Sequence, residues 1–178
     1  HMELHQTSWQ DVIEHSDLVV AFGGLPLRNT QVAYGGITEH NSARDMRQAS
    51  EQGVTFCNIS PLQQDMPAWL NAQTLMPRPG TDVALMLGLA YVLEQESLLD
   101  RGFLHSHCEG YARFRHYLLG HSDGVAKTPE WAAQLADVDA AALLQLARRM
   151  AAERTFITAA WSLQRADHGE QPYWMVVT

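Results

Sequence analysis

The chain has 178 residues, 46% of them hydrophobic, which is enough for one ordinary hydrophobic core. Its formal net charge is −8, with 12 Lys plus Arg against 20 Asp plus Glu, and this balance excludes the class of nucleic-acid binders that rely on a basic surface. The longest uncharged apolar stretch, residues 83–93, is shorter than the roughly 18 residues that span a bilayer, so no membrane insertion is expected.

The first half of the chain alternates short apolar runs with one amphipathic segment. Residues 16–22 form an apolar run rich in β-branched side chains and closed by two glycines, which predicts a buried strand that ends in a tight turn. A polar loop follows. Residues 41–52 show helical periodicity up to Gly53, where a helix is expected to stop. Two further strands are predicted over residues 54–59 and 74–76.

The second half of the chain is mostly helical. An apolar stretch from Asp82 to about residue 96 predicts a helix that is buried on more than one side, with Thr81 or Asp82 as its cap. Thr128, followed by proline, and Asp139 are placed to cap two later helices. In chain order, the remaining expected elements are helices over 100–105, 111–119, 129–136 and 140–153, a strand over 155–160, and an apolar helix that begins near 171.

This order of elements predicts an α/β fold with a short parallel sheet and helices on both faces. Ligands of an open parallel sheet bind at the carboxyl ends of its strands, and glycine there allows a ligand to approach the backbone. The helix start at Thr81 suits an anion, and Asp82 is able to accept both donors of a guanine edge. A turn glycine or a helix cap is the ordinary alternative at each position. The strand ends carry Phe22, Gly23 and Gly24, then Ile59, Ser60 and Pro61, then Gly80, Thr81 and Asp82, and last Ala160, Trp161 and Ser162.

Other candidate sites do not have the required spacing. His105, His107 and Cys108 stand close together, but their spacing fits no common zinc site, so no metal ligand is assigned. A catalytic triad is an arrangement in space, so the consecutive residues His121 to Asp123 are better explained as part of a turn. Cys57 and Cys108 are interpreted as structural or incidental thiols. The sequence contains neither GxGxxG nor a P-loop, so no generic nicotinamide or ATP site is predicted.

Three long stretches, residues 79–104, 117–133 and 159–178, carry a resemblance to a known family. They read PGTDVALMLGLAYVLEQESLLDRGFL, YLLGHSDGVAKTPEWAA and AAWSLQRADHGEQPYWMVVT, and the segment SWQDVIEHSDLVV near the start is similar as well. They resemble the dimethyl sulfoxide reductase family of molybdopterin oxidoreductases, and within it the branch of the biotin sulfoxide and trimethylamine-N-oxide reductases. The resemblance covers nearly the whole chain and is weakest over residues 24–75.

The resemblance implies that residues 1–178 are one Rossmann-like, dinucleotide-binding domain, cut at both ends from a larger enzyme, with residues 1–2 as a cloning scar. That enzyme would carry molybdenum on bis(molybdopterin guanine dinucleotide) and reduce an S-oxide or N-oxide by oxygen-atom transfer. The piece alone is expected to be inactive and to hold no cofactor tightly. Its expected partners are the remaining domains and the small-molecule oxide. The expected location is cytoplasmic, with the periplasm as the alternative.

The resemblance also implies which residues contact the cofactor, and where this chain departs from the family. Trp161 and Arg165 would also line the approach of the substrate, and because they are four residues apart they are expected to share one face of a helical turn. The family usually has Asn-Pro after the first strand and Asp-Pro after the second, where this chain has Leu25-Pro26 and Ser60-Pro61. These departures motivate an alternative, a degenerate, non-catalytic α/β domain that acts in binding or interaction. The implied cofactor contacts are Phe22, Gly23, Ile59, Ser60, Gly80, Thr81, Asp82, Trp161, Ser162 and Arg165.

Overall fold

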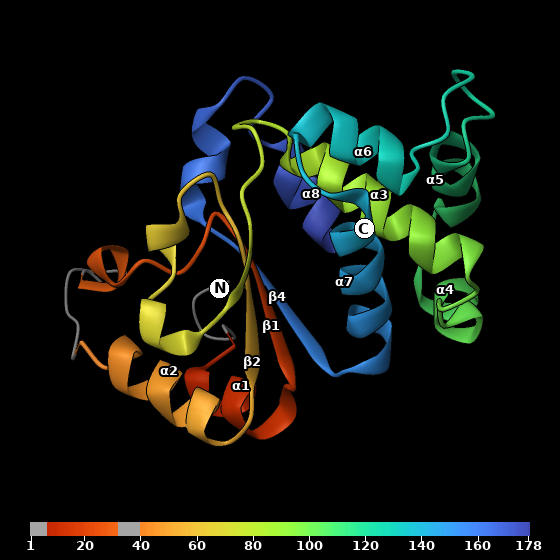
Figure 1. Ribbon diagram of the computed structural model, residues 1–178. Coiled ribbons are helices and arrows are strands. Elements are labelled where there is room, and N and C mark those ends of the chain that lie inside the picture. Colours follow the sequence, from red (N-terminus) through yellow and green to blue (C-terminus); the bar gives the residue numbers. More distant parts are fainter. Residues whose placement is uncertain (1–6, 32–39) are drawn as a thin grey trace. The chain divides into compact units, whose positions relative to one another are not determined.

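The computed structural model describes residues 7–31 and 40–178, and these residues pack into two compact units (Figure 1). Within the described chain, unit 1 contains residues up to 76 together with 153–163, and unit 2 contains 77–152 and 164–178. Part of the predicted loop, residues 32–39, and the supposed cloning scar lie outside the described residues. The assignment of the whole chain to one domain stays a prediction.

Unit 1 is built on a parallel sheet whose strand order is β3-β2-β1-β4. Strand β1 lies between β2 and β4, and Val20 is in register with Cys57 on one side and Ile157 on the other. All five residues of β1 are buried, as expected of a central strand without charged residues. The α/β class with a parallel sheet is thus confirmed. The strands are β1 (Leu18–Phe22), β2 (Thr55–Ile59), β3 (Gln73–Leu75) and β4 (Thr155–Ala159).

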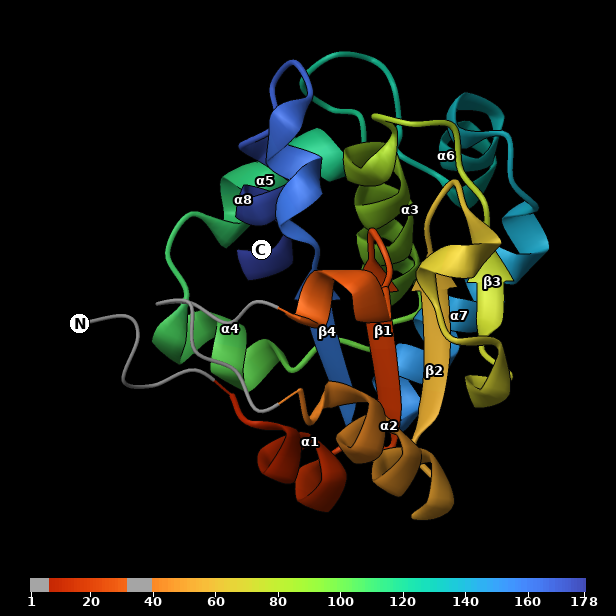
Figure 2. The same ribbon diagram turned by 90° about the vertical axis from the view of Figure 1, so that its left-hand side faces the viewer.

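Two helices of unit 1, α1 (Trp9–His15) and α2 (Ser42–Glu51), cover the same face of the sheet (Figure 2). Helix α2 buries Met46 and Ala49, the pair whose spacing of three had indicated a helix. Its core partners are Val12 and Ile13 from α1, Val19 and Ala21 from β1, and Phe56 from β2. The six helices predicted after residue 80 all fall in unit 2, so the two α-helices that unit 1 itself contributes, α1 and α2, lie on one face of its sheet.

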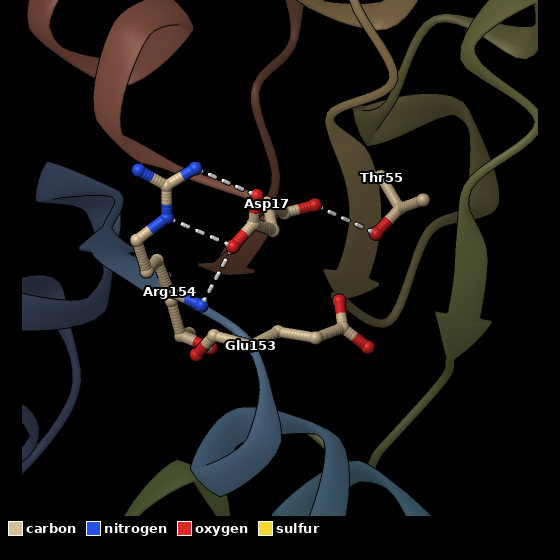
Figure 3. A network of polar contacts seen from close by, with 5 residues as sticks. Asp17, Thr55, Glu153 and Arg154 are labelled. Atoms are coloured by element: carbon tan, nitrogen blue, oxygen red, sulfur yellow. Dashed lines mark hydrogen bonds and ion pairs between the residues drawn. The ribbon is translucent and has the colours of Figure 1, made fainter.

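The amino ends of three strands are joined through Asp17 (Figure 3). The Asp17 carboxylate accepts two hydrogen bonds from the Arg154 side chain, both at 3.0 Å, and one from the Arg154 backbone N–H at 3.1 Å. The Asp17 carbonyl accepts from the Thr55 N–H and hydroxyl. This network connects the starts of β1, β2 and β4, at the edge of the sheet opposite to the carboxyl ends.

Unit 2 is helical and is organised around α3 (Asp82–Gln95), which packs against α5, α6, α7 and α8 (Figure 1). The prediction that this helix is buried on more than one side is therefore confirmed. Gly88 allows α3 and α6 to approach each other closely, because a Cβ at this position would lie 2.7 Å from the Cβ of Ala132 on α6. No helix among the described residues reaches the length and apolarity that a membrane crossing requires. The other helices are α4 (Arg101–His107), α5 (Tyr111–Leu118), α6 (Pro129–Ala136), α7 (Ala140–Ala152) and α8 (Gln171–Val177).

The predicted caps Thr128 and Asp139 are confirmed, and of the two alternatives for α3, Thr81 and Asp82, the Thr81 hydroxyl is not the cap. The Thr128 hydroxyl accepts from the Trp131 N–H at 3.2 Å, and the Asp139 carboxylate accepts from the Ala141 N–H at 3.0 Å. Thr81 is the N-cap residue of α3, but its hydroxyl does not cap the helix. It donates instead to the Arg78 carbonyl at 2.7 Å, which closes the turn that precedes the helix.

Candidate functional site

The carboxyl ends of all four strands meet at one edge of the sheet in unit 1. The Gly23 N–H donates to the Ile59 carbonyl and the Ala160 N–H donates to the Phe22 carbonyl, both at 2.7 Å. The Ser60 N–H donates to the carbonyl of Leu75, at the end of the next strand. The structure therefore brings Phe22, Gly23, Ile59 and Ser60 to one edge, where parallel strands place ligand contacts. Their role as cofactor contacts stays a prediction.

The two glycines after β1 serve the packing of the protein itself. Gly23 and Gly24 have φ values of +83° and +73°, which side chains rarely adopt. A Cβ at Gly23 would lie 2.6 Å from the Cβ of Ala160, and a Cβ at Gly24 would lie 2.6 Å from the Cβ of Asp65. Ala160 and Asp65 occupy the space on the Cβ side of these glycines, so packing within the protein accounts for them there. The expectation that a ligand approaches their backbone stays a prediction.

Replacing Gly24 with alanine is expected to lower the free energy of unfolding by about 2–3 kcal/mol, the combined cost of a positive φ and of overpacking. Urea unfolding followed by circular dichroism measures this loss. Gly53 is the matched control, since its φ is +95° but a Cβ there meets no atom within 4 Å. Alanine at Gly53 should cost about 1 kcal/mol. If both substitutions lower the free energy of unfolding equally, a steric clash with Asp65 does not explain the need for glycine at position 24.

Three residues from separate turns form a polar network at the same edge. The buried Ser60 hydroxyl donates to Asp65 Oδ2 at 2.6 Å, and the Arg28 guanidinium pairs with Asp65 Oδ1. Arg28 belongs to the 3-10 turn η2 (Leu27–Gln31), and Asp65 ends the turn η3 (Gln63–Asp65). The hydroxyl of Ser60, one of the implied cofactor contacts, thus donates to a carboxylate of the protein. Sequence reasoning missed Arg28 and Asp65, because no local pattern links residues that far apart.

A pocket of about 410 Å³ begins at η3 and extends along the 3-10 turn η4 (Ala68–Leu70) to β3. All of its polar lining groups are neutral amides or a hydroxyl, which suit a ligand that both donates and accepts hydrogen bonds. Its lining residues are Gln63, Gln64, Met66, Pro67, Ala68, Asn71, Ala72 and Thr74.

The start of α3 forms the candidate site of unit 2. Asp82 stands in the first turn and is 8% exposed, and burial raises the pKa of its carboxyl. The hydrogen bond that opposes this shift comes from the backbone of Asp82 itself. Gly80 is exposed, and a Cβ there would meet no atom within 4 Å. This helix start therefore combines an open approach with a buried carboxylate that a donor ligand would stabilise.

The residues after β4 form a 3-10 turn, η5 (Trp161–Arg165), and not an α-helical turn. With about three residues per turn, positions four apart differ by about 120°. The expectation that Trp161 and Arg165 share a face is therefore wrong. Trp161 is 69% exposed, and Ser162 and Arg165 are exposed too, so each of the three is accessible to a ligand on its own.

The remaining candidates of the sequence are separate from these sites. His105 and His107 lie on α4, and the exposed Cys108 follows that helix. Over residues 7–31 and 40–178, no three His, Cys, Asp or Glu side chains are grouped so as to hold a metal ion. Cys57 is buried in β2.

Comparison with known proteins connects this chain to a family. The chain is 40% identical over 173 residues to a dimethyl sulfoxide/trimethylamine N-oxide reductase of Cereibacter sphaeroides, covering 97% of this chain and 21% of the relative. It is 40% identical over 163 residues to a biotin sulfoxide reductase of the same organism, covering 92% of this chain and 22% of the relative. It is 38% identical to a trimethylamine-N-oxide reductase of Haemophilus influenzae. The chain thus spans about a fifth of the length of these relatives.

A solved structure supports the fold. Acetylene hydratase from Pelobacter acetylenicus aligns with a TM-score of 0.63 at 20% identity, over 84% of this chain and 18% of that chain. This identity is low, so the likeness concerns the fold alone. The family model described as molybdopterin oxidoreductase matches residues 2–178, and with the three relatives this match shows that the chain belongs to the molybdopterin oxidoreductase family.

Proposed function

We propose that this chain is a cofactor-binding part of a molybdenum enzyme that reduces S-oxides or N-oxides by oxygen-atom transfer. The observation that carries the proposal is the match to reductases of dimethyl sulfoxide, trimethylamine N-oxide and biotin sulfoxide along almost the whole chain. The cofactor would be bis(molybdopterin guanine dinucleotide), of which this chain would hold one arm in a Rossmann-like domain. A cytoplasmic location, with the periplasm as the alternative, stays a prediction.

The residues of unit 1 fit part of a dinucleotide arm. The neutral pocket beside η3 offers amide and hydroxyl groups to a base or a ribose. Backbone groups of Gly23 and Ile59, and the exposed Trp161 and Ser162, stand at or just beyond the carboxyl ends of the strands. When bound, the cofactor would supply the two-electron chemistry of oxygen-atom transfer, and the residues of this chain would bind and orient it.

The residues at the start of α3 in unit 2 suit the hydrogen-bonding edge of a guanine base. An ionised carboxylate accepts the two parallel donors that guanine presents, its N1–H and its 2-amino group. Burial raises the pKa of Asp82, so a ligand that donates hydrogen bonds would stabilise the charged form. Gly80, Thr81 and Asp82 are therefore the proposed base contacts. Arg165, exposed after β4, is proposed to donate to a cofactor phosphate or to the oxide.

One observation favours a second candidate, a non-catalytic domain that acts in binding or interaction. Ser60 stands where the resemblance leads us to expect an acidic residue, and its hydroxyl is buried and bonded to Asp65. A ligand contact expected from the family is thus altered at this position.

The size and metal content of the native polypeptide decide between the two. An antibody raised against this chain should detect a polypeptide several times heavier than 19.9 kDa, and that protein, purified, should contain molybdenum and release guanine nucleotide on acid treatment. The 178-residue chain purified in the same way is the control, and we expect it to be inactive and free of molybdenum. A native band near 19.9 kDa without molybdenum would contradict the reductase proposal and support the non-catalytic domain.

A further inference from the structure

Arg28 is held at the carboxyl edge of the sheet by a largely buried carboxylate. Its guanidinium Nη2 pairs with Asp65 Oδ1, and its side chain is 61% exposed, whereas that of Asp65 is 12% exposed. The other oxygen of Asp65 accepts the Ser60 hydroxyl at 2.6 Å. Both carboxylate oxygens are therefore occupied by groups of the protein, and what this network presents to the solvent is the arginine.

The carboxylate that holds Arg28 is itself fixed by the backbone. The Leu25 N–H donates to the Asp65 carbonyl at 2.7 Å, and the Asp65 N–H donates to the Leu62 carbonyl at 3.1 Å. Gly24 packs directly against Asp65. The two departures from the family pattern, Leu25 and Ser60, thus both bond to Asp65, which connects the turn after β1 to the turn after β2.

Arg28 differs from the other arginines described in unit 1. Arg154 is bound at the amino edge of the sheet, whereas Arg44 and Arg47 lie on α2. The chain has a formal charge of −8 and therefore repels anions. An anionic ligand at the carboxyl ends of the strands needs a nearby positive side chain to overcome this repulsion. A guanidinium carries five N–H donors in a planar fork, so binding Asp65 through Nη2 leaves donors for a second anion.

We propose that Arg28 binds a phosphate group of the ligand at this edge, and that Asp65 and Ser60 are positioning residues that hold its guanidinium in place. The inference rests on the proposed function for the ligand, which would be the diphosphate of a guanine dinucleotide. Asp65 lowers the entropy lost on binding, because the arginine is ordered before the ligand arrives. In this role Ser60 acts through Asp65.

Titration of the 178-residue chain with guanosine diphosphate, guanosine and inorganic pyrophosphate, followed by NMR chemical shifts, tests the proposal. Replacing Arg28 with glutamine (R28Q) is expected to weaken binding of guanosine diphosphate about tenfold or more and to leave binding of guanosine unchanged. D65N should weaken it by about threefold, because the arginine is released but remains charged. R44Q is the matched control, since Arg44 is 69% exposed and also pairs with a carboxylate, that of Asp45. Its affinity should equal that of the wild type.

The outcomes separate this inference from the proposed function. If the wild type binds guanosine diphosphate and R28Q binds it equally well, the inference is wrong and the proposed function stands. If the wild type binds neither guanosine nor its diphosphate, guanine recognition by the isolated chain fails, and the molybdenum content of the native protein still tests the proposed function separately. In that case, pyrophosphate binding that is lost in R28Q but kept in R44Q supports Arg28 as an anion site, and pyrophosphate binding unaffected by R28Q, or absent, overturns it. Circular dichroism confirms that each variant is folded.

Discussion

Replacing Glu94 with glutamine is expected to lower the free energy of unfolding by about 2 kcal/mol at pH 7. The Glu94 side chain is 2% exposed at the end of α3, where it pairs with Arg101 at 2.9 Å and accepts hydrogen bonds from Tyr111 and Arg115. Glutamine keeps the shape and removes the charge, so these interactions weaken together. Both arginines are about half exposed and regain water, which keeps the loss below that of a fully buried ion pair. Urea unfolding measures it.

The difference between the wild type and the Glu94→Gln variant is expected to depend on pH. Burial raises the pKa of Glu94, but the hydrogen bonds from Arg101, Tyr111 and Arg115 outweigh burial and lower the pKa from 4.5 to about 2. The folded-state pKa lies below the unfolded one, so the stabilisation is complete above about pH 4.5 and is lost as the pH falls toward 2. The difference in unfolding free energy between the two proteins should therefore narrow as the pH falls from about 4.5 toward 2. A constant gap would contradict the assignment of the shift to this carboxylate.

Glu96 provides the control for burial. It stands two residues beyond Glu94 and forms a two-pronged pair with Arg148, at 2.8 and 2.7 Å. Water reaches both partners, whose side chains are about one third and one half exposed, so glutamine at this position should cost much less than at Glu94. A similar loss at both positions would show that the number of arginine contacts, and not burial, sets the effect.

The secondary structure could be predicted where its signals are local. The helix expected over residues 129–136 coincides with α6, because Thr128 and Pro129 mark its start within two residues. Helix α1 was not predicted, because a helix of seven residues has too few turns for its hydrophobic periodicity to be recognised. Its one signal is the capping box, in which Ser8 and Asp11 each bond to the backbone of the other.

The candidate site could be predicted only in its location. Parallel strands bring their carboxyl ends to one edge, so the edge follows from the order of elements. The contacts within it do not follow, because Arg28 and Asp65 are 37 residues apart and each looks like an ordinary surface residue in the sequence. The geometry of the turn after β4 could not be predicted from the sequence either. Spacing alone did not distinguish the 3-10 turn that carries Trp161 from an α-helical turn, and that difference separates it from Arg165.

Replacing Lys127 with alanine is expected to lower the free energy of unfolding by about 3 kcal/mol, through lost packing and lost charge together. Lys127 is 2% exposed, between α5 and α6. Its ammonium group lies 2.6 Å from Asp123 Oδ2, donates to the Val125 carbonyl, and stands 4.3 Å from the ring centroid of Tyr117. A second ring, Trp131, lies 5.6 Å away. Removal of the side chain leaves a cavity that these rings line.

Two variants separate packing from charge at this position. Lys127→Met keeps most of the volume and removes the ion pair, so it should lose less stability than Lys127→Ala. Asp123→Asn keeps the lysine and its aromatic contacts, and Asp123 is itself partly solvated, so this loss should be the smallest of the three. If Asp123→Asn costs as much as Lys127→Ala, the ion pair dominates and the aromatic rings contribute little.

Chemical labelling of Lys127 measures how often its surroundings open to solvent. Lys127 is the only lysine among the 12 basic residues of the sequence, so an amine-reactive reagent has one side-chain target in the chain. Buried between Asp123 and two aromatic rings, it should react only when the segment between α5 and α6 opens. Labelling of Lys127, measured by mass spectrometry against urea concentration, should therefore follow unfolding in the wild type and run ahead of it in Asp123→Asn. Rapid labelling of the folded wild type would mean that this segment opens readily, and the stability loss predicted for Lys127→Ala would then not be observed.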